Sequence, residues 1–398
     1  METVRRGAVV GVDQVLDPVQ VTERDAGAEA AVHELLLRLA GHLPDRLMTE
    51  LRDELADGQR RHVARQVAFE TLSRPLQLEP EEIDLLRAEL VGDEADAGLV
   101  AALPDLRGQR RPEAWLFVSA LPDVPAKAEP VVRPLDLTGD PAGHPFPLDP
   151  VDRVLVRELA AAPQVTAVWR SWRMPSPSRT WHEPVRVVVL SLEQATDEGP
   201  GPAELARWAR GVLAGAGDPG VQVEVCRAGL GAPLYQTLAR SCGALLWAAR
   251  PATPVRVAPA FDGVDPVRGP WFAPDRPTVA DEQLQQRLLE ALTSAEVIAR
   301  SDSGMTDVIE PRRGAVVPLH LRTDGAWVWS EVTAYYLAAH GLAPDPDLAR
   351  HLLDPDGTPP LDEVALHRVL VHLLDRSADQ IAWTAPPPAD ERAGGGDA

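Results

Sequence analysis

The stretch Val185-Arg186-Val187-Val188-Val189-Leu190-Ser191-Leu192 is nearly all apolar and predicts a β-strand. A second strand pattern, Val165–Trp169, precedes it, and the alternating residues of Val221–Val225 follow. Across residues 149–260 the predicted elements run helix, strand, strand, helix, strand, helix, strand. This order is typical of an α+β sandwich in which helices cover one face of a mixed sheet.

The region before this segment has a helical period. Val32, Leu35, Leu36 and Leu39 follow the spacing of one helix face. Three further short helices are expected between residues 44 and 92, the last one opening at Pro80-Glu81-Glu82, where acids favour a helix start. Short connections between such helices predict a small helical bundle.

The region after residue 278 mixes both patterns. Thr323-Asp324-Gly325 lies between two apolar runs and predicts a β-hairpin, because Asp-Gly supports the backbone of a tight turn. Ser330 is placed to cap a helix that ends at Gly341, and Asp345-Pro346 opens another. This region predicts a small α+β module.

The sequence therefore predicts an α+β multidomain protein, with an N-terminal small helical bundle, a central mixed-sheet α/β sandwich and a C-terminal small α+β module. The expected boundaries are 1–24 for an N-terminal arm, 25–92 for the helical module, 93–148 for an extended linker with one strand, 149–260 for the central domain, 278–384 for the C-terminal module and 385–398 for a disordered tail. A Pro-rich join, residues 251–277, connects the last two modules.

Composition limits the function. The 398 residues hold 39 Lys and Arg against 60 Asp and Glu, a formal net charge of −21, which disfavours nucleic-acid partners. Two cysteines, Cys226 and Cys242, are too few for a disulfide framework, which favours a reducing compartment. Asp13 interrupts the short apolar patch after Arg5-Arg6, and no run approaches the length of a membrane span. We expect a cytoplasmic protein with no membrane span.

Patterns of site chemistry are weak. His367 and His372 are five residues apart, which does not match a metal-binding helix pair, and Gly229-Leu230-Gly231 is better explained as a turn than as a phosphate loop. We expect no catalytic residue, no metal and no cofactor. One enzymatic alternative remains open, a hydrolase or transferase that uses Asp307, Asp324 and Arg322 near the predicted hairpin.

Tryptophan is unusually frequent, with 10 Trp against 3 Tyr and 5 Phe. Arg and Trp interleave in a polar, Pro-rich segment that predicts a protein-binding loop. The candidate binding residues there are Arg170, Trp172, Arg173, Arg179 and Trp181. Trp327 and Trp329 share one face of a predicted strand. That face is either core or, if exposed, a further contact for a partner.

Two resemblances add expectations. The order and patterning of residues 151–235, including Pro184–Leu192, Glu204–Ala214 and Pro233-Leu234-Tyr235, resemble the C-terminal domain of SseB-like (enhanced serine sensitivity) proteins. That resemblance implies a small, non-enzymatic bacterial domain linked to secretion or regulation. The segments Met305–Val308, Arg322–Gly325 and His340–Pro346 look like a module recurrent in uncharacterised actinobacterial proteins, which implies no particular activity.

Together these observations predict a non-enzymatic, cytoplasmic adaptor or immunity-type protein that binds another protein, with a basic partner favoured by the charge. The alternatives are a structural or accessory component of a bacterial secretion or injection assembly, and the hydrolase or transferase described above. The oligomeric state is left open.

Overall fold

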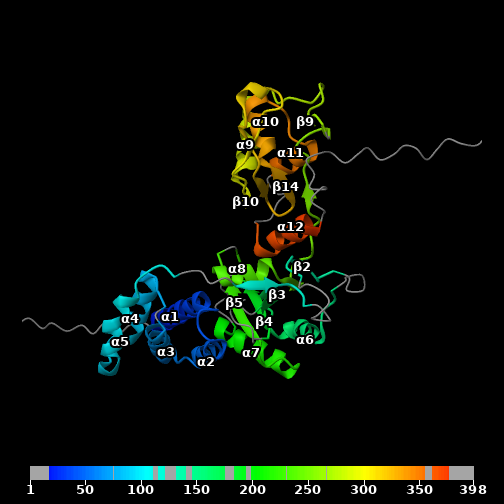
Figure 1. Cartoon of the computed structure of the whole chain (residues 1–398). Coiled ribbons are helices and arrows are strands. Elements are labelled where there is room, and N and C mark those ends of the chain that lie inside the picture. The colour runs from blue at the N-terminus through cyan, green and yellow to red at the C-terminus, as the bar shows by residue number, and fades with distance from the viewer. Residues whose placement is uncertain are drawn as a thin grey trace, which may run out of the picture. The chain divides into compact units, whose positions relative to one another are not determined.

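The computed structural model describes residues 18–74, 76–110, 115–121, 131–139, 146–174, 183–193, 199–229, 231–265, 267–354 and 361–375, with side chains from residue 27 onward. The fold is mixed α/β and multidomain (Figure 1), as the sequence predicts. The chain divides into two compact units. The first comprises Met1–Trp115 with Glu198–Gly211, and the second comprises Leu116–Asp197 with Val212–Ala398.

The first unit is built from short helices. These are α1 (Pro18–Leu39), α2 (Asp45–Ala56), α3 (Arg60–Ser73), α4 (Pro80–Leu90), η1 (Glu94–Asp96), α5 (Ala97–Ala102) and η2 (Leu103–Leu106). The four helices expected between residues 25 and 92 are all present. The first begins earlier than expected, at Pro18, inside the segment predicted as an N-terminal arm.

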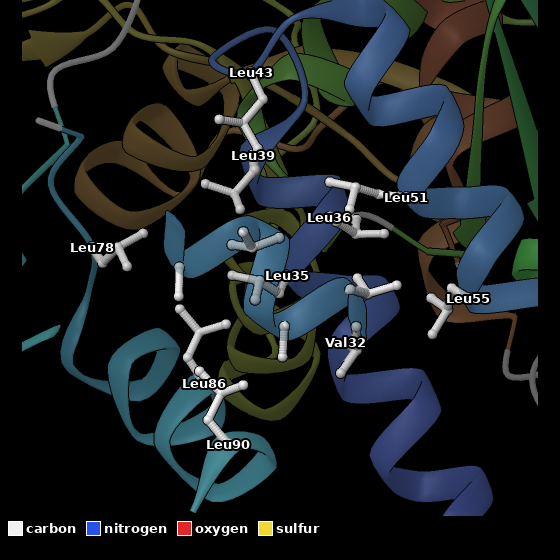
Figure 2. Close-up of a cluster of buried hydrophobic side chains, with 14 of the residues drawn as sticks. Val32, Leu35, Leu36, Leu39, Leu43, Leu51, Leu55, Leu78, Leu86 and Leu90 are labelled. Atoms are coloured by element: carbon white, nitrogen blue, oxygen red, sulfur yellow. The ribbon is translucent and has the colours of Figure 1, made fainter. Parts of the chain in front are cut away.

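One hydrophobic cluster joins these helices (Figure 2). The apolar period of α1 turns Val32, Leu35, Leu36 and Leu39 into it, where each side chain is buried. Leu103 and Leu106 enter the same cluster. The linker expected from residue 93 is therefore wrong for residues 94–106, because packing stabilises short helices that local periodicity alone does not reveal.

The second unit contains the central sheet. Its elements are β1 (Leu116–Val118), β2 (Leu135–Asp136), α6 (Pro150–Glu158), η3 (Leu159–Ala161), β3 (Val165–Met174), β4 (Val185–Leu192), β5 (Gln222–Arg227), α8 (Leu234–Ser241) and β6 (Ala244–Ala248). Helix α7 (Pro202–Gly215) follows β4 in the chain and belongs to the first unit as far as Gly211. The element order matches the prediction for residues 149–260. The strand order is β2-β6-β3-β4-β5, with β1 also on β3. The sheet is mixed, because β3 and β4 are antiparallel whereas β4 and β5 are parallel.

Helices lie on both faces of this sheet, which corrects the expectation of one covered face. Arg240 of α8 stacks over Trp169 of β3, whereas the next residue, Arg170, pairs with Asp152 of α6. Since successive strand residues face opposite sides, α8 and α6 cover opposite faces (Figure 1). Burial along almost the whole of β4 has the same cause.

The rest of the second unit begins with short strands. These and the following elements are β7 (Arg256–Val257), β8 (Gly263–Asp265), β9 (Gly269–Trp271), α9 (Glu282–Ser294), β10 (Glu296–Ala299), β11 (Gly304–Met305), η4 (Pro311–Arg313), β12 (Val317–Pro318), β13 (Leu321–Thr323), β14 (Trp327–Ser330), α10 (Glu331–His340), α11 (Pro346–Leu353) and α12 (Glu363–Asp375). A four-stranded sheet has the order β10-β13-β14-β7. The Pro-rich join expected at residues 251–277 thus contains three strands.

Several local predictions in this region are confirmed. Strands β13 and β14 form the expected hairpin, in which Gly325 has a positive φ of 96°. The hydroxyl of Ser330 accepts from Val332 N at the start of α10, and Gly341 ends that helix in the left-handed conformation. Asp345 caps α11.

Helix α12 bonds to the central sheet. Its His367 Nε2 donates to the Leu135 carbonyl at 2.9 Å, and Arg368 Nε donates to Asp136 Oδ2 at 3.0 Å. These contacts place the last described helix against strand β2, far from it in sequence. The tail predicted at residues 385–398 lies outside the described residues.

Candidate functional site

Arg170 and Trp172, two of the predicted binding residues, belong to a strand. Strand β3 continues through Met174, so the expected loop does not begin at Arg170. Arg170 is buried; its Nη1 donates to the Ser119 carbonyl at 2.7 Å, and its Nη2 lies 3.3 Å from Asp152 Oδ2. The charge of Arg170 is thus accommodated by partners within the fold rather than by solvent.

Arg186 of β4 completes this buried ion cluster. It donates to Asp152 Oδ1 at 2.6 Å, to Asp149 Oδ2 at 2.7 Å and to Asp218 Oδ2 at 2.8 Å. Burial raises the pKa of Asp149, but the N–H of Asp152 and the Arg186 guanidinium outweigh burial and hold the pKa below its ordinary value. The cluster pairs its charges internally, while Arg170 Nε and Asp152 Oδ2 are buried without a hydrogen bond to the described residues.

The remaining members of the predicted binding segment divide between described and undescribed parts. Arg173 Nη1 donates to the Tyr235 hydroxyl at 2.9 Å and lies over the Tyr235 ring at 5.9 Å. Arg179 and Trp181 lie outside the described residues. Protein binding by this segment stays a prediction.

Trp327 and Trp329 lie in the core of the C-terminal region. Their side chains are 7% and 1% exposed, within one hydrophobic cluster. The Trp329 Nε1 donates to the Leu292 carbonyl at 3.1 Å. The sequence leaves open whether this face is core or a partner contact, and in the structure both side chains are in the core.

Asp307 is the centre of a buried polar cluster. Its Oδ1 accepts from the backbone N–H groups of Ile309 and Glu310, at 2.9 and 3.1 Å. Its Oδ2 accepts from the Tyr335 hydroxyl at 2.9 Å and from His340 Nε2 at 2.7 Å. Burial raises the pKa of Asp307, but these four donors hold the pKa well below its usual range. The carboxylate fixes the loop after it onto α10.

Asp324 and Arg322 use other partners. Asp324 Oδ2 accepts from His351 Nε2 at 2.6 Å, while its Oδ1 accepts from backbone N–H groups of the hairpin turn. Arg322 donates to Glu331 Oε1 and to the Ala295 carbonyl, both at 2.6 Å. Hydrogen bonds therefore join Asp307, Asp324 and Arg322 to three separate sets of neighbours. Within the described ranges, no group of three His, Cys, Asp or Glu side chains is placed to hold a metal ion.

The strongest candidate surface is the hairpin formed by β8 and β9. Three of its large apolar side chains face solvent: Val264 is 46% exposed, Val267 is 93% exposed and Trp271 is 47% exposed. Singly exposed apolar residues are common, but three on one nine-residue hairpin are not. We call Val264, Val267 and Trp271 the hairpin surface. Val264 lies opposite Pro270 and Trp271 lies opposite Gly263, so these two side chains are on the two faces of the hairpin.

The base of the hairpin is anchored in the core. Phe261 before it and Phe272 after it pack on each other and on Tyr336, with ring centroids 4.7 to 6.1 Å apart. Asp262 accepts from Ala273 N at 2.8 Å and from Arg276 Nη1 at 2.9 Å. Since an isolated two-stranded hairpin is marginal in water, this anchoring stabilises it.

The turn of the hairpin is also held. Asp265 Oδ1 accepts from Val267 N at 2.8 Å and from Arg268 N at 2.7 Å. These two backbone bonds lower the pKa of Asp265, and Gly269 supplies the positive φ of 83° that the turn needs. The backbone N–H of the exposed Val267 is therefore held by Asp265.

Gly263 makes room for Trp271. The two residues are directly opposite in the β8–β9 register. A Cβ atom at position 263 would lie 2.5 Å from atoms of the Trp271 ring. The indole therefore lies flat against the glycine backbone, which orders a half-exposed aromatic side chain.

No protein-family model, curated protein or solved structure matches this chain. A binding surface is therefore assigned from the exposure and packing of this chain's own residues. Among the described helices, none combines the length and the apolar composition needed to cross a bilayer.

The sequence prediction missed the hairpin surface because Pro251–Pro277 was interpreted as a join. A signal was present in the residues themselves. Asp265 and Gly269 are typical turn residues, and they lie between Val264 and Trp271, which favour strands. The short length of both strands, three residues each, weakened that signal.

Proposed function

We propose that this chain is a non-enzymatic, cytoplasmic protein-binding adaptor or immunity-type protein whose main contact is the hairpin surface. The observation that carries the proposal is the simultaneous exposure of Val264, Val267 and Trp271 on one anchored hairpin. Clustered exposed apolar residues mark interaction sites, and Trp is among the residues most enriched at the energetic centre of interfaces.

Order in the hairpin supports the same role. The Asp265 bonds to the turn and the packing of Trp271 on Gly263 restrict these side chains before a partner arrives. A contact that is already ordered loses less conformational entropy on binding, so more of the contact energy becomes affinity. A hairpin of this kind fits an apolar groove on a partner.

Charge supports a basic partner. The chain carries a net charge of −21, which accelerates encounter with a positively charged protein at low ionic strength. Added salt is then expected to lower the rate constant of association and to change the rate constant of dissociation much less.

Two other functions are alternatives to protein binding by an adaptor. A component of a bacterial secretion or injection assembly predicts self-association, which light scattering measures. A hydrolase or transferase near residues 322–324 has less support, because the side-chain atoms of Asp307, Asp324 and Arg322 are engaged by different neighbours.

The proposal is tested by comparing the proteins captured by three forms of the full chain: the native form, the double variant Val267→Asp/Trp271→Ala, and Phe69→Ala. Phe69 is 55% exposed on a helix of the first unit, so it controls for loss of an exposed aromatic side chain. We expect a partner that the native chain and Phe69→Ala retain and that the double variant loses.

That partner is then purified and its affinity is measured for all three forms. We expect the double variant to lose about 2 kcal/mol or more of binding free energy, as substitutions at the centre of an interface do. Equal affinity of the double variant and the native chain contradicts the placement of the contact on the hairpin surface.

A further inference from the structure

The parallel strands β4 and β5 end side by side. Their register pairs Ser191 with Cys226 and Leu192 with Arg227. Gly229 follows directly, in the loop between β5 and α8, and has a positive φ of 127°. In sheets with parallel strands, ligands bind outside the carboxyl ends of those strands, where loop N–H groups point outward.

A carboxylate of the chain itself already lies at the carboxyl ends of β4 and β5, which we call the carboxyl edge of these strands. Glu363, the first residue of α12, accepts from the Ser191 hydroxyl through Oε1 at 2.6 Å and from Gly229 N through Oε2 at 2.6 Å. Ser191 is fully buried and Glu363 is 6% exposed. These donors lie 172 and 134 residues away from Glu363 in the chain.

The donor set matches a carboxylate group. One hydroxyl and one backbone N–H each bond a different oxygen, which fixes the plane of the carboxylate. Both donors are neutral groups that bond a carboxylate oxygen directly. Burial of a carboxylate without good bonds is unfavourable, so this edge is shaped for such a group.

Ion pairs at both ends also hold the helix that supplies Glu363. Arg250 and Arg133 reach Asp362 and Asp375 at its two ends, but both pairs are largely exposed and contribute little. The firmer contacts are those of His367 and Arg368 with β2, farther along the helix. The first turn of α12 also buries Val364, which is 7% exposed, and Glu363 supplies its hydrogen bonds to β4 and to the loop after β5.

We propose that the carboxyl edge of β4 and β5 is a carboxylate-binding site that Glu363 keeps closed, and that a carboxylate ligand competes with Glu363 for Ser191 and Gly229. Binding of the ligand then releases the first turn of α12 from the sheet. This site is distinct from the hairpin surface and does not depend on the function proposed for it.

The test uses the full chain with Glu363→Ala and sodium acetate as the probe, with sodium chloride at equal ionic strength as the comparison. The amide signal of Gly229 is followed by NMR in a glycine-labelled sample. We expect saturable acetate binding to the variant, at least about tenfold tighter than to the native chain, a difference of about 1.4 kcal/mol. Asp375→Ala, at the other end of the same helix, is expected to behave as the native chain does.

Two further forms make the outcome decisive. Ser191→Ala added to Glu363→Ala is expected to abolish acetate binding. Glu363→Gln keeps the size of the side chain without its charge, and it replaces Glu363→Ala if that variant does not fold. A folded variant whose Gly229 signal responds equally to acetate and chloride, or to neither, overturns the proposed site.

Release of α12 is measured separately, by amide hydrogen exchange of residues 363–367 in the native chain. Saturating acetate is expected to accelerate this exchange, while exchange in β4 stays unchanged. Acetate binding without faster exchange in α12 overturns the competition with Glu363.

Discussion

The guanidinium group of Arg186 lies 4.4 Å from the centroid of the Trp172 ring. Arg170 lies near the same ring, at 6.0 Å, and both arginines reach Asp152. Arg and Trp in one segment resemble the composition of an interface, yet these side chains form a structural cluster on one face of the central sheet. Cation–π contact with this half-buried ring stabilises such a cluster.

Replacement of Trp172 is expected to destabilise the fold. Trp172→Ala removes the half-buried ring under Arg186, so we expect the free energy of unfolding to fall by about 1–3 kcal/mol. Urea denaturation measures the change. Trp271→Ala, which truncates a half-exposed ring, is the matched control and is expected to change stability by less than about 1 kcal/mol. Equal losses for the two variants contradict the structural role of Trp172.

Removal of the charge at Asp152 is expected to be more severe. Asp152→Asn leaves Arg170 and Arg186 buried with one fewer anion, and breaking such a pair costs about 3–5 kcal/mol. Asp375→Ala breaks the exposed pair with Arg133 and is expected to cost about 1 kcal/mol or less. Thermal and urea unfolding compare the two. A small effect at Asp152 argues against a buried ion cluster.

Stability is expected to fall as the solution is acidified. Burial lowers the pKa of His367 below its ordinary value near 6.5, and the positive charge of Arg368 lowers it further. The hydrogen bond to the Leu135 carbonyl and the charge of Asp136 raise this pKa and offset only part of the decrease. The unfolded chain therefore binds a proton as pH falls through about 6.5, whereas the folded chain resists, so the stability present above that pH is lost below it. The slope is at most about 1.4 kcal/mol per pH unit.

The comparison of the native chain with His367→Gln isolates this contribution. His42 acts in the same direction, because burial and Arg110 lower its pKa to about 4. We expect the unfolding midpoint of His367→Gln to depend less on pH between about 7 and about 5 than that of the native chain. Parallel pH profiles rule out a neutral buried His367.

Two glycines are expected to respond to alanine in opposite directions. Gly341 has φ of 66° at the end of α10, where Gly341→Ala is expected to cost about 1–2 kcal/mol. Gly211 lies inside α7, and a Cβ atom there would meet nothing within 4 Å. Gly211→Ala is therefore expected to stabilise the chain by about 0.5–1 kcal/mol. Shifts of the same sign in melting temperature contradict this assignment.

Features decided by a few neighbouring residues were predictable. Ser330, Gly341 and Asp345 each act over two to four residues, and the structure confirms all three as helix boundaries. The hairpin at Asp324-Gly325 follows the same rule. The order of elements through residues 149–260 was also predictable, because periodicity distinguishes strand from helix.

Features that depend on distant partners were not predictable. The sequence places Arg170 in a polar loop, whereas the structure places it inside the sheet because Asp152 neutralises it there. The Glu363 contact is missed for the same reason, whereas the β8–β9 hairpin has a local turn signal that its short strands weaken. Neither the anchoring of Phe261 on Tyr336 nor the bond between Ser191 and Glu363 has a local signal.

The amino-acid sequence by itself determined the mixed fold, the helix ends and the buried strand Val185–Leu192, because capping, turn chemistry and hydrophobic period act between near neighbours. Only the tertiary structure decided which polar residues are buried and which apolar residues are exposed. A buried arginine or glutamate is stable only where distant segments supply its counter-charges and donors, and those distances arise on folding.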